Sequence, residues 1–399
     1  MPYTENGLKI VENKILLLNL RNPNRVTTVI PKSKVVGENQ VAVKWGLDEA
    51  QVLKNLNVKN VPSPILGHYN WPGLHKPFDH QKDTASFLTL HPRAFCLNEQ
   101  GTGKTGSVIW AADYLMKVGR IKRVLVICPL SIMDSAWRAD LFKFAMHRHV
   151  DIAYGAKEKR SAIINGTAEF VIINYDGVEI VQDDIANGGF DLIVVDEANA
   201  YKNAQTTRWK TLNKIMKPDT WLWMLTGTPA AQSPVDAFGL AKLVNPKGVP
   251  KFFSAFKDQV MYKVSQFRWV IRPNADKIVF EALQPAIRYT KDECLDLPEM
   301  TYVAREVELT PQQKKYYEAL RKQLVVQASG EQVTAVNAAV GLSKLLQISC
   351  GAVYSDSGET LEFDIKNRYK VMREVIDRSE EHTSELQSRE TISYAVFCL

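Results

Sequence analysis

The stretch Asn98-Glu99-Gln100-Gly101-Thr102-Gly103-Lys104-Thr105 decides the fold class of this 399-residue chain. It lies between the apolar run Ala94–Leu97 and an amphipathic segment that begins at Lys104 and ends at Gly119. A strand, a glycine-containing turn and a helix in this order direct backbone N–H groups and a helix N-terminus at one point, which favours anions. The sequence therefore predicts a phosphate-binding loop, in which Asn98 takes the place of the first glycine of the usual pattern.

Four further apolar runs predict the sheet to which this loop belongs. They are Val124–Cys128, Phe170–Ile173, Leu192–Val195 and Trp221–Leu225, and amphipathic segments alternate with them. Runs that are nearly continuous in apolar residues are typical of strands buried on both faces. We therefore expect an α/β fold, with a parallel sheet covered by helices on both faces. Ligands of such sheets bind at the carboxyl ends of the strands.

Asp196 and Glu197 follow the run Leu192–Val195 and are expected at that same edge. Mg²⁺ in phosphate sites keeps most of its waters and takes few protein oxygens, so Asp196 and Thr105 would hold the metal. Glu197 would orient and deprotonate the attacking water, while Lys104 would reach the β- and γ-phosphates. An Asp-Glu pair after a strand is by itself more typical of a solvated loop. The phosphate loop upstream is what favours ATP and Mg²⁺ as the bound groups.

The segment Thr226-Gly227-Thr228-Pro229 ends the next apolar run, Trp221–Leu225. Its hydroxyls would sense the γ-phosphate and relay its loss to neighbouring elements. Taken alone, the segment is an ordinary turn. Three such signals at three strand ends of one sheet together predict a nucleotide-binding site.

These motifs resemble those of the nucleic-acid-dependent ATPases called superfamily two helicases. The resemblance lies in Gln81, Gly101–Thr105, Asp196-Glu197-Ala198 and Leu225–Pro229. Lys202-Asn203, Leu297-Pro298 and the segment from Gln312 to Leu320 are similar to the Swi/Snf-like translocase branch, with bacterial and tailed-phage members most alike. The resemblance covers about residues 76–377. It implies a RecA-like P-loop NTPase fold.

The resemblance also assigns residues to the nucleotide. Phe78 and Gln81 would contact adenine, although a glutamine on a helix surface is the alternative for Gln81. Asn199 stands where the family usually has His or Asp, and with Thr226, Gly227 and Thr228 it would couple hydrolysis to motion. An amide donates and accepts hydrogen bonds but carries no charge. The implied nucleotide contacts are Phe78, Gln81, Gly101, Thr102, Gly103, Lys104, Thr105, Asp196 and Glu197.

Nucleic-acid contacts follow from the same resemblance. Phosphate contacts position a protein without reading sequence, which suits a motor that works on any sequence. Arg208 and Lys210 would add salt-dependent attraction, but an ordinary solvated face is the alternative for each basic side chain. Trp137 is interpreted as a packing residue. The implied contacts are Pro129, Leu130, Ser131, Asn174, Tyr175 and Lys202.

The segments around these motifs suggest the domain organisation. Residues 1–74 predict a small accessory α+β module, with strand-like runs at Leu8–Val11, Val26–Ile30 and Val41–Trp45 and a helix from Leu47 to Leu56. Residues 75–255 are expected to form the first RecA-like lobe. Residues 256–300 would connect it to an incomplete second RecA-like lobe, residues 301–377.

This second lobe is expected to open with a strand at Tyr302–Leu309. Thr310 as N-cap and Pro311 at the first helical position predict a helix through about Val326, and another helix would run from Gln332 to Ile348.

The end of the chain has a different character. The segment Arg378–Ser388 resembles the translation of a sequencing-library adapter, so residues 378–399 are expected to be non-native. The sequence contains no Gln-x-x-Gly-Arg-x-x-Arg motif, from which the family draws its catalytic arginines. We therefore expect a truncated form that binds ATP and Mg²⁺ but hydrolyses ATP slowly.

Composition limits the classes of protein that fit. Hydrophobic residues make up 45% and charged residues 24%, which is typical of a folded chain. No run approaches the roughly 18 apolar residues of a membrane helix. Cys96 and Cys128 lie in apolar runs and are expected to be buried thiols. These features predict a cytoplasmic protein without a membrane partner, and a monomer is favoured. The net charge of +6 permits a polyanionic partner.

The sequence thus predicts an ATP-driven helicase or translocase that acts on DNA. One alternative is an RNA helicase. Another is a nucleotide-gated module that binds nucleic acid without turnover, which the uncharged Asn199 would suit.

Overall fold

The structure is a computed structural model, which describes residues 7–230, 232–265, 268–294, 304–330, 335–354 and 359–380. The chain divides into two compact units, Met1–Leu297 and Pro298–Leu399. The first unit contains all the motifs quoted above except those after Leu297.

The first unit begins with a four-stranded antiparallel sheet in the order β1-β2-β4-β3. Alternate side chains of β2 and β4, among them Leu16, Leu18 and Val43, are buried together with Leu53 of the helix α2. These residues form a small hydrophobic core, separate from the two cores of the larger sheet. The elements are β1 (Leu8–Val11), β2 (Ile15–Asn19), α1 (Asn24–Val29), β3 (Lys34–Gly37), β4 (Gln40–Lys44), α2 (Leu47–Asn55) and α3 (Ile65–His68).

One prediction for this module was wrong. The run Val26–Ile30 was predicted to be a strand, but residues Asn24–Val29 form the helix α1. Pro23 precedes them with a helical φ of −58°, a value to which the proline ring is restricted. The Thr28 hydroxyl also donates to the carbonyl oxygen of Asn24 at 2.8 Å, which satisfies a backbone group of the helix. A five-residue run of valine, threonine and isoleucine cannot by itself distinguish one helical turn from a strand.

A seven-stranded parallel sheet forms the centre of the first unit, in the order β13-β5-β10-β9-β6-β8-β7. It confirms the predicted fold class and all five predicted strands. The edge strand β13 lies within residues 256–300, the segment assigned above to a connection. The strands are β5 (Arg93–Cys96), β6 (Val124–Cys128), β7 (Val150–Ile152), β8 (Phe170–Asn174), β9 (Leu192–Val195), β10 (Trp221–Leu225) and β13 (Ala286–Ile287).

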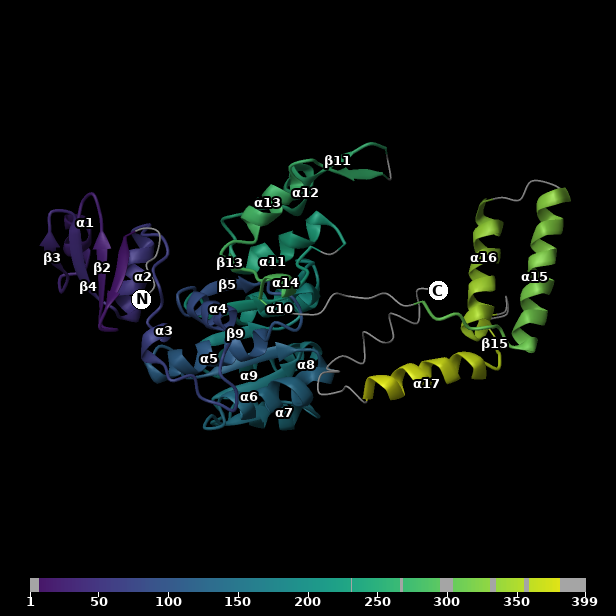
Figure 1. The fold of residues 1–399 in the computed structure, drawn as a ribbon, viewed down its shortest axis with the longest axis horizontal. Coiled ribbons are helices and arrows are strands. Elements are labelled where there is room, and N and C mark those ends of the chain that lie inside the picture. Colours follow the sequence, from purple (N-terminus) through teal and green to yellow (C-terminus); the bar gives the residue numbers. More distant parts are fainter. Residues whose placement is uncertain are drawn as a thin grey trace. The chain divides into compact units, whose positions relative to one another are not determined.

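Helices cover both faces of this sheet (Figure 1). Along β6, Val126 and Cys128 pack against the helices of one face, and Leu125 and Ile127 pack against those of the other. Each buried side chain of this kind contributes about 1.5–3 kcal/mol to folding. One face carries α4 (Asp79–Thr89), α5 (Lys104–Lys117), η2 (Met133–Arg138) and α6 (Ala139–Phe144); the other carries α7 (Lys157–Ile164), α8 (Tyr175–Ile180), α9 (Gln182–Asn187), α10 (Thr207–Ile215) and α11 (Ala237–Val244).

Shorter elements complete the first unit. Cys96 and Cys128 are fully buried thiols, as predicted. The remaining elements are η1 (Leu130–Ile132), η3 (Ala198–Tyr201), η4 (Pro234–Asp236), α12 (Phe253–Val260), β11 (Met261–Lys263), β12 (Trp269–Ile271), α13 (Ala275–Ala282) and α14 (Lys291–Cys294).

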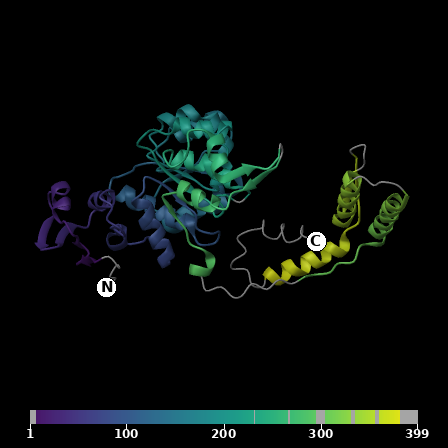
Figure 2. The same ribbon diagram turned by 90° about the horizontal axis from the view of Figure 1, so that it is seen from above.

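The second unit contains two helices that lie side by side, α15 and α16 (Figure 1, Figure 2). Thr310 and Gln313 form a reciprocal cap at the start of α15: Gln313 N donates to Thr310 Oγ1 at 3.4 Å, and Thr310 N donates to Gln313 Oε1 at 3.1 Å. This cap confirms the predicted helix start. The elements are α15 (Pro311–Gly330), α16 (Ala335–Cys350), β14 (Ala352–Tyr354), β15 (Thr360–Glu362) and α17 (Lys366–Glu380).

The predicted strand Tyr302–Leu309 was wrong where the structure describes it. Residues 304–309 form no strand, and residues 302–303 lie outside the described residues. A strand requires hydrogen bonds from a neighbouring strand, which the mixed apolar and charged pattern of this segment does not supply by itself. The predicted start of the next helix, residues 332–334, and residues 381–399 of the predicted non-native tail also lie outside the described residues. Within the described part of the chain, no helix has the length and apolar character needed to cross a membrane.

Candidate nucleotide-binding site

The predicted phosphate loop joins β5 to α5, as the sequence indicated. Gly101 and Gly103 have φ values of 84° and 76°, which glycine adopts readily and other residues rarely do. The Lys104 ammonium donates to the carbonyl oxygens of Asn98 at 2.9 Å and Glu99 at 3.1 Å. These two bonds hold the cation inside the loop that it would share with a phosphate.

Asn98 has a structural role that the sequence did not reveal. Its side chain is 1% exposed. The amide nitrogen donates to Thr84 Oγ1 at 2.8 Å, and the amide oxygen accepts from the backbone N–H of Tyr289 at 3.0 Å. Asn98 therefore ties the loop to α4 and to the segment that follows β13. No local pattern could have predicted a partner so distant in the sequence.

Gln81 and Phe78 lie beside the loop at the start of α4. The Gln81 amide nitrogen donates to the carbonyl oxygen of Thr102 at 3.3 Å, and its oxygen accepts from Phe78 N at 3.0 Å. His80, which was not predicted, also contacts Thr102 O through Nε2, at 2.9 Å. The Phe78 ring is 61% exposed. Gln81 is thus a partner of the phosphate loop, and Phe78, whose ring stacks on that of His80 with centroids 5.8 Å apart, is largely exposed.

Asp196 lies at the carboxyl end of β9 and is held by two donors. Trp137 Nε1 donates to Oδ2 and Glu197 N donates to Oδ1, both at 2.9 Å. Burial raises the pKa of Asp196, while these hydrogen bonds and the charge of Lys104 oppose the rise. In the sheet, β10 pairs with both β5 and β9, so the residues that follow Cys96 and Val195 leave the sheet at the same edge. Trp137 is fully buried, as expected of a packing residue, and it also orients this carboxylate.

Glu197 turns the chain away from the sheet in an unusual conformation. Its φ of 47° lies in the left-handed region, which costs a residue with a side chain roughly 1–2 kcal/mol. Tyr175 Oη donates to the carbonyl oxygens of Asp196 at 2.6 Å and Glu197 at 3.3 Å. These bonds from the end of β8 hold the turn in place.

The segment after β10 lies between the other two motifs, because β10 is the strand between β5 and β9. Thr226 N donates to the carbonyl oxygen of Cys96 at 3.1 Å, which joins this segment to the strand before the loop. On the other side, the Asn199 amide donates to Thr228 O at 2.9 Å and lies 3.3 Å from Thr228 Oγ1. A Cβ at Gly227 would lie 3.6 Å from Asn98 O. The three predicted motifs therefore meet at one edge of the sheet.

The residues predicted to contact nucleic acid divide into two groups. Asn174 pairs in register with Cys128, so Asn174 and Tyr175 lie beside Pro129, Leu130 and Ser131 at the ends of neighbouring strands. Leu130 and Ser131 are exposed.

Lys202 differs from this group. Its ammonium donates to Gln232 Oε1 at 2.7 Å and pairs with Asp236 at 3.2 Å. Its charge is therefore engaged within the protein.

The donor set fits a magnesium ion. Among the described residues, no group of three or more His, Cys, Asp or Glu side chains has metal-binding geometry. Thr105 and Asp196 offer hard oxygen ligands, and Mg²⁺ bound to a nucleotide needs only one or two of these from the protein. The residues present therefore suit Mg²⁺ carried with a triphosphate rather than a closed site for a softer metal.

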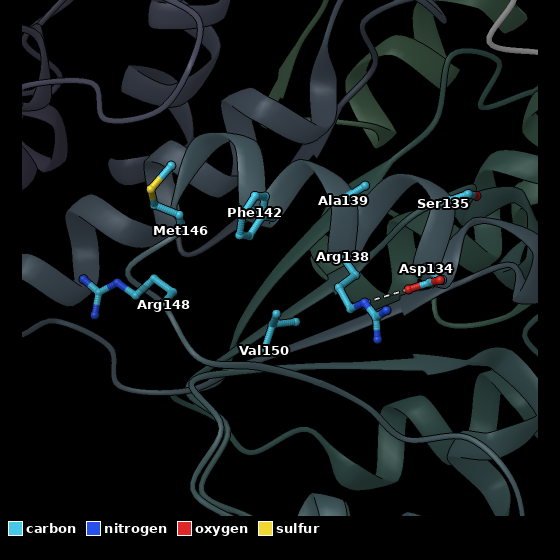
Figure 3. A pocket seen from close by; sticks show the side chains of 8 residues that line it. All are labelled: Asp134, Ser135, Arg138, Ala139, Phe142, Met146, Arg148 and Val150. Atoms are coloured by element: carbon cyan, nitrogen blue, oxygen red, sulfur yellow. Dashed lines mark ion pairs between the residues drawn. The ribbon is translucent and has the colours of Figure 1, made fainter.

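Two hollows of about 550 Å³ lie near the free edge of the sheet at β7. Figure 3 shows the first, where Phe142, Met146 and Val150 lie beside the ion pair of Arg138 with Asp134, whose atoms are 2.7 Å apart. Neither hollow is lined by a residue predicted to contact the nucleotide. The second includes Leu130.

Comparison with known proteins decides the family. The SNF2-related domain family matches residues 80–351, which is more than half of the chain. The chain belongs to this family. The resemblance to the Swi/Snf-like branch of superfamily two is therefore confirmed, and so is the RecA-like class of fold.

Individual relatives of the chain are matched over only part of their own length. Protein p41 of Acyrthosiphon pisum secondary endosymbiont phage 1 is 27% identical over 274 residues, which is 64% of this chain and 59% of the phage protein. An uncharacterized ATP-dependent helicase of Mycoplasma genitalium, MG018, is 27% identical over 55% of this chain and 21% of its own length. The chain thus spans less than two thirds of each.

A solved structure is also similar. The Sulfolobus solfataricus SWI2/SNF2 ATPase core in complex with dsDNA has a TM-score of 0.48 and 23% identity, and the match covers 70% of this chain and 59% of that one.

Proposed function

We propose that this chain is the ATP-binding part of an ATP-driven motor that acts on duplex DNA. One observation carries the proposal: the loop with Lys104, the pair Asp196-Glu197 and the Thr226–Thr228 segment converge at the ends of β5, β9 and β10. Membership of the SNF2-related domain family supports the same conclusion.

The proposed roles follow from the chemistry of each group. Lys104 and the loop amides bind the β- and γ-phosphates, and Gln81 with Phe78 contacts the adenine. Thr105 and Asp196 hold Mg²⁺, which when bound neutralises charge that develops on the phosphates. Glu197 orients the attacking water and accepts its proton. Asn199, through Thr228, links the acidic turn to the segment that senses the γ-phosphate.

Turnover by this chain is proposed to be slow. Its sequence has no Gln-x-x-Gly-Arg-x-x-Arg motif, and an arginine at the γ-phosphate is worth about 10³–10⁵ in rate. Nucleotide binding does not depend on that arginine, so binding is the property to measure.

DNA is favoured over RNA as the partner. Relatives of this chain include a SWI/SNF-related regulator of chromatin from Xenopus laevis, which is 25% identical over 205 residues. Location in the cytoplasm and a monomeric state complete the proposal.

The experiment compares binding of a fluorescent ATP analogue with Mg²⁺ by the chain and by Lys104→Ala. Loss of the charged donor weakens affinity at least about tenfold, because charge-assisted bonds contribute about 1.5–3 kcal/mol. Lys277→Ala, which removes an exposed lysine of α13, is the control and leaves affinity unchanged. Equal affinity of the chain and Lys104→Ala would refute the nucleotide site, and preference for RNA over duplex DNA in competition would refute the choice of partner.

A further inference from the structure

Tyr175 connects the acidic turn to a basic side chain at the surface. It is the first residue of α8, directly after β8, and its hydroxyl donates to the carbonyl oxygens of Asp196 and Glu197. Arg208 lies over the face of the ring, with its guanidinium carbon 4.9 Å from the ring centroid. One aromatic side chain therefore contacts both the acidic pair and a cation.

The hydroxyl acts on backbone whose conformation is costly. Glu197 has left-handed dihedral angles, φ 47° and ψ 57°. Such conformations persist only where the surroundings hold them, and they are common at functional sites. The hydroxyl of Tyr175, which follows the strand β8, stabilises this conformation through its two hydrogen bonds. Any displacement of its hydroxyl therefore alters the turn that aims Asp196 and Glu197.

Arg208 is available to an anion from outside. It pairs with Asp176 at 2.8 Å, but the Asp176 side chain is 79% exposed. An exposed ion pair is worth only about 0–1 kcal/mol, so a phosphate group can replace the carboxylate. Both residues lie close to the strand ends where nucleic-acid contacts are proposed. A phosphate that draws Arg208 from Asp176 changes its stacking on the Tyr175 ring.

We infer that Tyr175 is a positioning residue that couples occupancy of Arg208 by a DNA phosphate to the geometry of the Asp196-Glu197 turn. This inference rests on the proposed function, and it adds a route by which DNA and nucleotide affect one another. Coupling of this kind is reciprocal, so DNA strengthens nucleotide binding by the same factor as nucleotide strengthens DNA binding.

The chain offers matched controls for the tyrosine. The Tyr154 ring also lies beneath an arginine, with Arg160 at 5.5 Å, but Tyr154 is exposed and lies between β7 and α7 rather than at the end of β8. Tyr201 packs edge-on against Tyr175, with ring centroids 5.9 Å apart, and within the described residues its buried hydroxyl has no hydrogen-bond partner. Tyr201→Phe therefore tests whether packing of the neighbouring ring is what matters.

The test measures the affinity of the whole chain for a fluorescent ATP analogue with Mg²⁺, with and without saturating duplex DNA. We expect DNA to strengthen nucleotide binding about tenfold in the unaltered chain, within the 5–150-fold range typical of coupled sites. Tyr175→Phe keeps the ring and Arg208 stacking but lacks the hydroxyl, so the ratio of nucleotide affinities with and without saturating DNA should fall below about twofold, whatever the change in DNA affinity itself. Tyr154→Phe and Tyr201→Phe keep the full coupling.

Arg208→Lys provides a second, independent variant. It retains the positive charge but loses the planar group that stacks on the ring. We expect it to bind DNA with little loss and to lose coupling as Tyr175→Phe does. Thermal unfolding of each variant verifies that it is folded.

The outcomes separate this inference from the proposed function. A chain that binds neither ATP nor DNA overturns both. A chain that binds both ligands without coupling, or a Tyr175→Phe variant that keeps the coupling, overturns the role of Tyr175 alone. Equal loss of coupling in Tyr201→Phe also overturns it, because packing would then account for the effect.

Discussion

The side-chain amide of Asn199 donates to the carbonyl oxygen of Thr228 at 2.9 Å, and this bond joins the turn after β9 to the segment after β10. The bond needs a donor but no charge. An uncharged amide at this position therefore still links the two motifs, in spite of the His or Asp that the family usually has there. A clamp without turnover does not follow from Asn199 alone.

Removing this link should loosen the segment after β10. In Asn199→Ala, we expect the Thr228 amide, which bonds to Thr226 Oγ1 at 3.2 Å, to exchange its hydrogen about fivefold faster, since one hydrogen bond contributes about 1 kcal/mol. Hydrogen exchange followed by mass spectrometry or NMR measures this. Asn187→Ala, which removes an exposed amide bonded within its own helix, is the control and leaves Thr228 exchange unchanged. Unaltered exchange in Asn199→Ala would show that the bond does not order the segment.

Gly103→Ala should weaken nucleotide binding by more than the strain of a left-handed alanine can account for. Its φ is 76° and an added Cβ would collide with the Gln81 side-chain amide. Gly119→Ala is the matched control, because Gly119 has a φ of 71° and nothing within 4 Å of an added Cβ. Both variants lose about 1–2 kcal/mol of stability by the strain of the left-handed conformation. Only Gly103→Ala should weaken ATP binding, as titration of the fluorescent analogue would reveal; equal weakening in both would point to general destabilisation.

Asn98→Gly restores the first glycine of the usual loop pattern, yet we expect it to destabilise the protein. It leaves the Tyr289 N–H and the Thr84 hydroxyl without their buried partner, at a cost of about 1–3 kcal/mol. Urea unfolding measures the change in the free energy of unfolding. Asn165→Gly, which removes an exposed amide bonded to Asp184, is the control and should lower the free energy of unfolding by less than Asn98→Gly does. A more stable Asn98→Gly variant would contradict the role assigned to this side chain.

Acid should destabilise the first unit partly through His91. Burial lowers the pKa of His91 from its ordinary value of 6.5 to about 4. As pH falls below 6.5, His91 binds a proton in the unfolded chain before it does so in the folded chain. The free energy of unfolding is therefore unaffected by His91 above pH 6.5 and decreases as pH falls from 6.5 to about 4. The loss reaches about 3 kcal/mol at 1.36 kcal/mol per pKa unit.

His91→Gln removes the titrating group, although it also removes the bond from Nδ1 to Phe87 O at 2.6 Å. The variant should therefore be less stable at neutral pH but lose less stability between pH 6.5 and 4 in thermal unfolding. The control Asn187→Ala, which removes an exposed amide that does not titrate, should retain the slope of the unaltered chain. An identical pH slope in His91→Gln would exclude His91 as the source.

The sequence alone determined the strands and the loop, because the residues that specify each of them are neighbours along the chain. Continuous apolar runs such as Val124–Cys128 and Leu192–Val195 are buried on both faces wherever they lie in a parallel sheet. The glycines of the loop and the acids that follow β9 occur at strand ends, and strand ends of a parallel sheet share one edge. Short apolar runs carry less information: Val26–Ile30 fitted a strand but formed a helix.

Only the tertiary structure decided which distant residues meet at that edge. The place of β10 between β5 and β9 brings Thr226 to Cys96 and Thr228 to Asn199. The pairing of β13 with β5 gives Asn98 its partner, Tyr289. Strand order depends on the packing of the whole sheet between its two helical layers. Each position in the sheet can be occupied by one strand only. No short stretch of sequence predicts the strand order, because the packing free energy that selects it comes from side chains far apart along the chain.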